Sequence, residues 1–167
     1  MAKDGFRLDM GALQKVVGNM LDGMSKTEDL MEEIGMHMVD EIQAAMDAEE
    51  TFDGEKWPEG NRSGQALRNT SKLWGAIAYE ATGDSVAVGV GQAAADRHPE
   101  VHNEGMTIRP KNKKALKFQL PNGTWRTVKK VVIPKREFVP DFGESTRAQD
   151  EIRELCSEYM QEIMGIK

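Results

Sequence analysis

The chain has 167 residues, about the size of one ordinary domain, and 39% of them are hydrophobic, 6% aromatic and 30% charged. Its net charge is −6, but the segment from Arg109 to Arg136 holds ten Lys or Arg and no Asp or Glu, which leaves 12 basic and 28 acidic residues elsewhere. Nothing in it resembles a signal peptide or approaches the roughly 20 apolar residues of a membrane span, so we expect no membrane partner.

The first fifty residues are expected to form helices. Apolar residues recur at three-four spacing, first in Leu13, Val16, Val17, Met20, Leu21 and Met24. Thr27 suits the N-cap of a second helix, with Leu30, Met31, Ile34, Met38, Ile42, Ala45 and Met46 on one face and Glu32, Glu33, Asp40, Glu41 and Asp47 on the other. The many methionines either fill a core or form an adaptable surface for a partner. We expect an N-terminal helical region, 1–50, and an α+β core, 51–167, within one compact domain.

From Glu49 to Arg68 the helical periodicity stops. The turn residues Asp53 and Gly54 and the helix-breaking Pro58 predict a loop. A short helix is expected next, with Leu67, Leu73, Trp74 and Ile77 facing inward. The alternation from Ser85 to Val90 then predicts a short strand.

The basic segment contains the clearest local signal. The pair Asn122-Gly123 lies between two alternating runs and tolerates the positive φ angles of a tight turn, which predicts a β-hairpin. We expect its second strand to continue through Val131, Val132 and Ile133, with a bulge at Lys129-Lys130 and an end at Pro134.

A helix is expected at the C-terminus. Thr146 and Gln149 fit a capping box, and the apolar stripe that follows is Ile152, Leu155, Cys156, Tyr159 and Ile163. The predicted fold class is therefore α+β, with N-terminal helices and a C-terminal helix packed on a small, mainly antiparallel β-sheet that includes a basic β-hairpin. The expected structural anchors are Trp57, Leu73, Phe118, Trp125 and Phe138.

Few residues suggest chemistry. His98 and His102 are four apart, but Pro99 biases His98 away from helical angles, so a metal-dependent hydrolase here is the weakest of three functional hypotheses. We find no nucleophile motif and no phosphate-binding loop. The single cysteine, Cys156, rules out an intrachain disulfide and is expected to be a small buried apolar residue. We predict no enzymatic activity, no cofactor, no catalytic residues and no metal site.

The basic segment allows two interpretations. Its charges, with Phe118, Trp125 and Phe138 nearby, could bind DNA without sequence specificity and stack on bases. The excess of 16 negative charges in the rest of the chain instead favours contact between copies, basic face against acidic face, head to tail as in a ring. The residues expected in this interface are Lys111, Lys113, Lys114, Lys117, Arg126, Lys129, Lys130, Lys135 and Arg136.

The order of several short motifs adds a resemblance. They are Asp53-Gly54-Glu55-Lys56-Trp57, Thr70-Ser71-Lys72-Leu73-Trp74-Gly75-Ala76-Ile77, Val101-His102-Asn103-Glu104-Gly105 and Ile133-Pro134-Lys135-Arg136-Glu137-Phe138. In this order they resemble the phage virion morphogenesis family, which includes Mu-type tail-completion proteins, and its relatives among the minor tail proteins of long-tailed phages. The resemblance spans 53–167. The chain departs from it where 97–100 intrude and where Glu137 replaces the usual Pro.

This resemblance implies a structural virion protein that acts in tail completion or head–tail joining. It would form a ring, sixfold or a multiple, at the neck or the head-proximal end of the tail. Its partners would be copies of itself and neighbouring tail or neck proteins, in the virion and, during assembly, in the host cytoplasm. Phe138 would hold a turn on the core, and Arg136 either pairs with a neighbour's carboxylate or is merely solvated. The alternative function is a DNA-contacting accessory protein that uses the basic strands 109–136.

Overall fold

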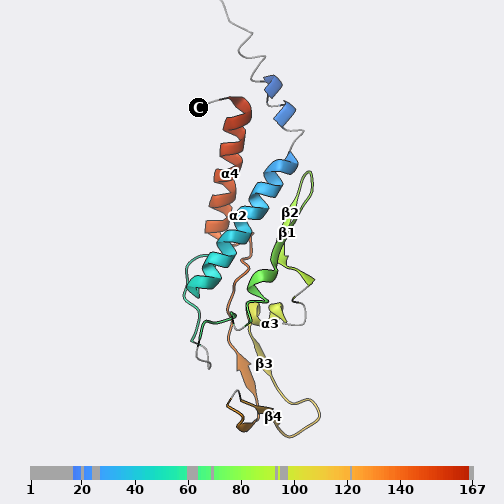
Figure 1. The fold of residues 1–167 in the computed structure, drawn as a ribbon, viewed down its shortest axis with the longest axis vertical. Helices are drawn as coiled ribbons and strands as arrows, with labels where there is room; N and C mark the ends of the chain where they lie inside the picture. Colours follow the sequence, from blue (N-terminus) through green and yellow to red (C-terminus); the bar gives the residue numbers. More distant parts are fainter. Residues whose placement is uncertain are drawn as a thin grey trace, which may run out of the picture.

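A computed structural model describes residues 17–19, 21–23, 27–59, 64–68, 70–92, 94, 98–120 and 122–165. The fold is α+β, as predicted. Helix α2 (Thr27–Ala48) packs against helix α4 (Thr146–Met164) and against a hairpin of β1 (Ile77–Ala81) and β2 (Val86–Val90). Together they form a body, from which the other strands extend at one end (Figure 1).

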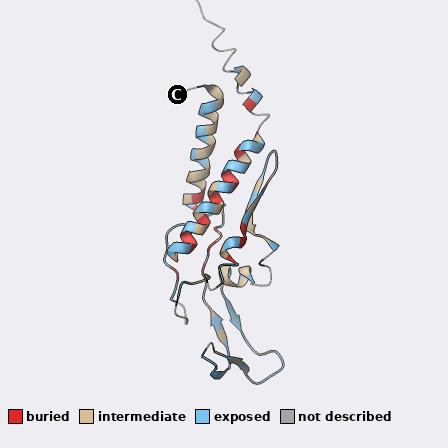
Figure 2. Cartoon of the chain, viewed as in Figure 1, coloured by how far each residue is buried: buried red, intermediate tan, exposed pale blue. Residues whose placement is uncertain are grey.

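Helix α2 supplies the centre of the core because its apolar residues recur at helical spacing and so share one face. Met38, Ile42 and Met46 are completely buried, and Phe52 and Phe138 are each 1% exposed in the same cluster. The buried residues line the inner side of α2 in Figure 2. The core therefore contains side chains from both expected regions, 1–50 and 51–167.

The segment between the first loop and β2 differs from the prediction. In place of a short helix there is a single 3-10 turn, Trp74–Ala76, followed directly by strand β1, which was not predicted. The expected inward positions hold better, since Leu73 and Ile77 are buried. Strand β1 pairs antiparallel with β2. Gly35 of α2 lies so close to this hairpin that a Cβ there would be 2.3 Å from the Tyr79 ring.

The remaining strands form an arm, residues 106–135, which we call the basic arm. At its root β3 (Met106–Ile108) pairs antiparallel with β6 (Val131–Ile133), and at its tip β4 (Leu116–Gln119) pairs with β5 (Trp125–Val128). No described residue of the arm is buried (Figure 2). The strand pairs that the structure describes are all antiparallel, but they form separate two-stranded sheets rather than one sheet.

The tip hairpin was predicted correctly, and its continuation was not. Gly123 has the positive φ, 82°, that the Asn-Gly pair indicated, and its N–H donates to the Leu120 carbonyl across the turn. The second strand ends at Val128 instead of bulging at Lys129-Lys130. Residues Val131–Ile133 pair with β3 because the chain at the arm's root places those two apolar segments side by side.

The N-cap of helix α4 lies one residue before the position expected from the sequence. Ser145, not Thr146, is the N-cap, and its hydroxyl accepts a hydrogen bond from the Ala148 N–H. The Ser145 hydroxyl in turn donates to Asp53 in the loop after α2, at 2.8 Å. The stripe residues Ile152, Leu155, Cys156 and Tyr159 pack against the core, as predicted. Cys156 is partly buried rather than fully buried as expected.

Most of the helix predicted from Leu13 to Met24 lies outside the described residues. Positions 17–19 and 21–23 are helical, and the side chains of Val17 and Leu21 are 46% and 65% exposed. Gly23 packs against Ile163 near the end of α4. Of the helices that the structure describes, none is long and apolar enough to cross a membrane.

Candidate functional site

Positive charge covers the basic arm. Lys111, Lys113, Lys114, Lys117, Arg126, Lys129, Lys130 and Lys135 are all exposed on it, as is Arg109. Among the described residues, only Lys135 of these has an ion-pair partner, Glu137, whose hydrogen bond and charge raise the Lys135 pKa above its ordinary value. Arg136, the last residue predicted for the interface, lies at the base of the arm and is buried.

The root of the arm has an apolar face. Met106 lies opposite Ile133, and Ile108 lies opposite Val131. Residues directly opposite one another, and residues two apart on a strand, point to the same side of a two-stranded ribbon. Met106 and Ile108 are 48% and 38% exposed. An isolated two-stranded ribbon is only marginally stable in water, so this ribbon would gain stability from a partner packed on its apolar face.

The tip of the arm carries an exposed aromatic residue. Trp125 was expected to face the core, but it is 60% exposed. The Lys117 ammonium lies 5.0 Å from its ring centroid. Phe118 is only half-buried. Neither ring reaches the core because no second layer covers a hairpin at the end of an arm. The other expected anchors, Trp57, Leu73 and Phe138, are buried.

The outward face of α2 is acidic. Glu28, Asp29, Glu32, Glu33 and Asp40 are exposed there, and none has an ion pair in the part of the chain that the structure describes. Met36, 52% exposed, lies one helical turn from Glu32 and Asp40. We call these residues the acidic α2 face. The face thus combines negative charge without an ion pair among the described residues and one exposed apolar side chain.

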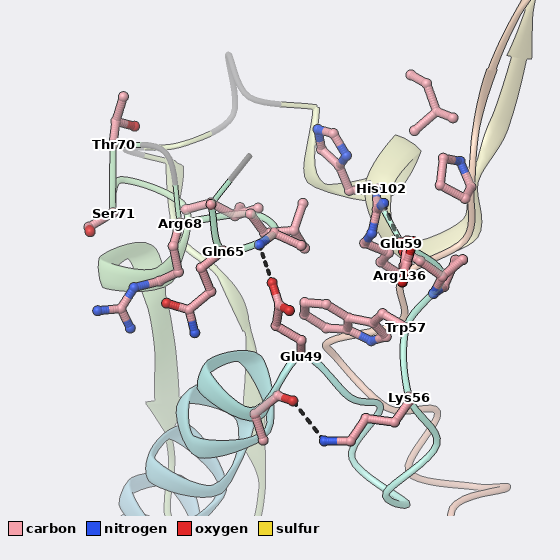
Figure 3. Close-up of a pocket in the computed structure, with 18 of the residues that line it drawn as sticks. Glu49, Lys56, Trp57, Glu59, Gln65, Arg68, Thr70, Ser71, His102 and Arg136 are labelled. Carbon is pink, nitrogen blue, oxygen red and sulfur yellow. Dashed lines mark hydrogen bonds between the residues drawn. The ribbon is translucent and has the colours of Figure 1, made fainter. Parts of the chain in front are cut away.

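A pocket of about 1360 Å³ opens at the base of the arm (Figure 3). Its walls come from the loop after α2, the segment before β1, helix α3 (Pro99–Glu104) and strand β6. Trp57, Leu73 and Ile133 provide apolar lining. His102 and Arg136 lie together at one end, and Arg68, Thr70 and Ser71 lie at the other (Figure 3).

Arg136 forms part of this pocket's wall. It is only 8% exposed, so the alternative of a solvated side chain is wrong. One terminal nitrogen, Nη2, donates to the Pro58 carbonyl at 3.0 Å, and the Arg136 N–H donates to the His102 carbonyl at 2.9 Å. The buried Nε has no acceptor, and no carboxylate in the described ranges pairs with the guanidinium.

The two histidines are not arranged as metal ligands. His98 precedes α3 in a left-handed conformation, with φ of 51°, and is exposed, whereas His102 lies within the helix and is half-buried. Burial, followed by the charges of Arg136 and His98, lowers the pKa of His102. Within the described residues, no group of three His, Cys, Asp or Glu side chains could hold a metal ion.

One residue that organises the site was not found from the sequence. The side-chain oxygen of Asn103 accepts hydrogen bonds from the N–H groups of Phe138 and Val139, at 2.9 and 3.0 Å, and its amide donates to the Val139 carbonyl at 3.2 Å. Asn103 thus holds the turn after Arg136 against α3. A polar residue inside the Val101–Gly105 motif was the available signal.

A comparison with protein families identifies the chain. A sequence profile of the phage virion morphogenesis family matches residues 8–161. The chain belongs to this family. The match extends over both helices, the basic arm and the pocket, and it confirms the resemblance carried by the motifs from Asp53 onward. Neither the curated proteins nor the solved structures compared with the chain gave a match.

Membership of the phage virion morphogenesis family establishes a coarse function. The protein has a structural or assembly role in a bacteriophage virion, and the virion is its location.

Proposed function

We propose that the chain is a subunit of a homo-oligomeric ring that completes the tail or joins it to the head, without enzymatic activity. Such a ring would lie at the neck or the head-proximal end of the tail, with sixfold symmetry or a multiple, and would be assembled in the host cytoplasm. The observation that supports this most is the basic arm, which exposes an apolar face and cations that, Lys135 excepted, have no ion pair among the described residues.

In this proposal the arm of one copy lies against the acidic α2 face of the next. The arm and the body carry charges of opposite sign, and each surface adds exposed apolar residues: Met106, Ile108 and Trp125 on one, Met36 on the other. Opposite potentials guide encounter and register, while burial of the apolar side chains supplies the attraction. Because the two surfaces differ, each contact is head to tail and can close a ring.

The proposal is tested by light scattering of the purified chain over a range of concentrations. We expect association that weakens with salt and that weakens strongly in the double variant Lys129→Glu, Lys130→Glu. The reversed pair Glu32→Lys, Glu33→Lys should have the same effect, and the two sets combined should restore association. Lys72→Glu, an exposed cation outside the arm, is the matched control and should change nothing. A monomer at every concentration, also in the presence of isolated tails, contradicts the proposal.

The role in joining is tested separately with phage that lack the gene. We expect separate heads and tails to accumulate in electron micrographs, and arm variants that fail to associate should fail to complement. Normal joined particles without the protein would contradict a role at the junction.

A second candidate, contact with DNA, is favoured by one observation. Trp125 is exposed at the tip beside Lys117, among cations that have no carboxylate partner within the described residues. Aromatic rings among cations suit nucleic-acid strands, which offer phosphates and base faces. Binding to single-stranded DNA should then fall with salt and with Trp125→Ser. Absence of binding at low salt would eliminate this candidate.

A further inference from the structure

The guanidinium of Arg136 has an unusual setting for a charged group. Of the cations that line the pocket, Lys56 pairs with Glu50 at 2.8 Å and Arg68 pairs with Asp47. Arg136 is more deeply buried than either, yet in the described chain it has one carbonyl acceptor, no carboxylate and an unpartnered Nε. A buried charge is normally retained only where an opposite charge compensates for its lost hydration.

Within the described residues, the surroundings of Arg136 do not provide that compensation. His102 is its neighbour, and a histidine whose pKa is lowered carries no charge near neutral pH and never a negative one. Glu49 lines the pocket, but its carboxylate accepts from the Ala66 N–H. Glu59, also in the lining, is exposed and makes no hydrogen bond to Arg136. The pocket, whose lining mixes polar and apolar residues, thus holds the Arg136 charge without a paired carboxylate among the described residues and is open to an incoming group.

We propose that the pocket receives an aspartate or glutamate side chain from a second copy of the chain, whose carboxylate pairs with Arg136. The inference rests on the ring proposed above and names the part of the contact that fixes its register. Two observations favour a second copy as the source. The pocket is continuous with the root of the arm, since Val131, Ile133 and Pro134 line it. The body also carries exposed carboxylates without ion pairs in the described residues, among them Glu32, Glu33, Glu154 and Glu158.

The pairing predicts opposite effects of one substitution on two properties. Arg136→Met replaces the guanidinium with a shorter, unbranched apolar side chain and removes the uncompensated charge, so the melting temperature of the monomer should stay the same or rise. Association should weaken on the order of 30-fold, because the inserted carboxylate loses its partner. Lys72→Met, outside the pocket, is the control and should alter neither property. A large loss of melting temperature, or unchanged association, overturns the inference.

A second experiment identifies the carboxylate. Arg136→Lys places an amine in the pocket, and a carbodiimide joins amines directly to carboxylates in contact with them. We would treat an associated mixture of nitrogen-14 and nitrogen-15 chains and locate the cross-link from position 136 by mass spectrometry. Mixed-isotope peptides with an Asp or Glu of the other copy are expected.

The possible outcomes separate the two proposals. A cross-link only to Glu59 of the same chain overturns the inference, because the pocket then satisfies its own charge. Associated chains with no cross-link at position 136 also overturn it and leave the ring proposal standing. Chains that stay monomeric at all concentrations and with isolated tails overturn both.

Discussion

Arg147 contacts both the ring and the backbone of Phe52. Its guanidinium lies 4.8 Å from the ring centroid, and its Nη1 donates a 2.8 Å hydrogen bond to the Phe52 carbonyl. The same side chain pairs with Glu151 at 2.7 Å and with Glu41 of α2. Burial acts to lower the pKa of Arg147, but the two carboxylates outweigh it and raise the pKa. Arg147, near the start of α4, thereby holds this helix against α2 and against the loop that follows α2.

Replacing this arginine should loosen the body. We expect Arg147→Met to lower the free energy of unfolding by about 2 kcal/mol, because it removes a hydrogen bond to a part-buried carbonyl and a cation–π contact. Urea unfolding followed by circular dichroism measures the change. The control is Arg153→Met on the same helix, whose pair with Asp150 is exposed and whose loss should change stability by less than about 0.5 kcal/mol. Equal effects would contradict the role given to Arg147.

Replacing Gly35 with alanine should lower the stability of the fold, although helix propensity alone predicts an increase. In a free helix interior Gly→Ala stabilises by about 1 kcal/mol, but here the new methyl group would meet the Tyr79 ring at 2.3 Å. We expect Gly35→Ala to destabilise by about 1–3 kcal/mol through overpacking between α2 and β1. Thermal unfolding measures it. Gly75→Ala, with no atom within 4 Å of the added Cβ, should be nearly neutral, and stabilisation by Gly35→Ala would contradict the packing described.

The two tryptophans Trp57 and Trp125 should differ in what they support. Trp57 is 8% exposed and donates through its indole N–H to the Glu137 carbonyl at 3.0 Å. Trp57→Ala should therefore cost about 3–5 kcal/mol of stability, whereas Trp125→Ala should change it by less than about 0.5 kcal/mol. Chemical unfolding gives both values. A large loss for Trp125→Ala would show that the arm's tip packs on the body, contrary to Figure 2.

His102 makes stability depend on pH. Its folded-state pKa lies below the ordinary value of 6.5, so the unfolded chain binds the proton more readily. Its effect is absent well above pH 6.5, and stability falls as the pH drops through 6.5 toward the folded-state pKa. We expect His102→Gln to lose less melting temperature than the wild type between pH 7.5 and 5. Parallel losses in the two proteins would rule out this contribution.

Local chemistry explains which parts of the fold could be predicted. The hairpin at Asn122-Gly123 depends on one positive φ angle, and the spacing along α2 fixes which face is buried, so both are visible in short windows of sequence. The partner of Val131–Ile133 is not a local property. Strand β3 and strand β4 both offer apolar alternation, and only the path of the chain at the root of the arm selects β3.

The site shows the same division. The charges of the arm and of α2 could be counted in the sequence. That the arm extends away from the body that contains α2 is known only from the structure. The burial of Arg136 could not be inferred, since its acceptor is the carbonyl of Pro58, 78 residues earlier. The exposure of Trp125 could not be inferred either, because an aromatic residue in an alternating strand faces a core only where a second layer of structure covers the strand.

The absence of buried residues from the described part of the arm has an evolutionary consequence. Substitutions there leave the packed interior of the body untouched and escape selection for folding. A phage lineage can therefore exchange or lengthen this segment without disturbing the buried core of the body. In descendants that diverge, we expect the tip hairpin to drift fastest and the turn held by Asn103 to drift slowest.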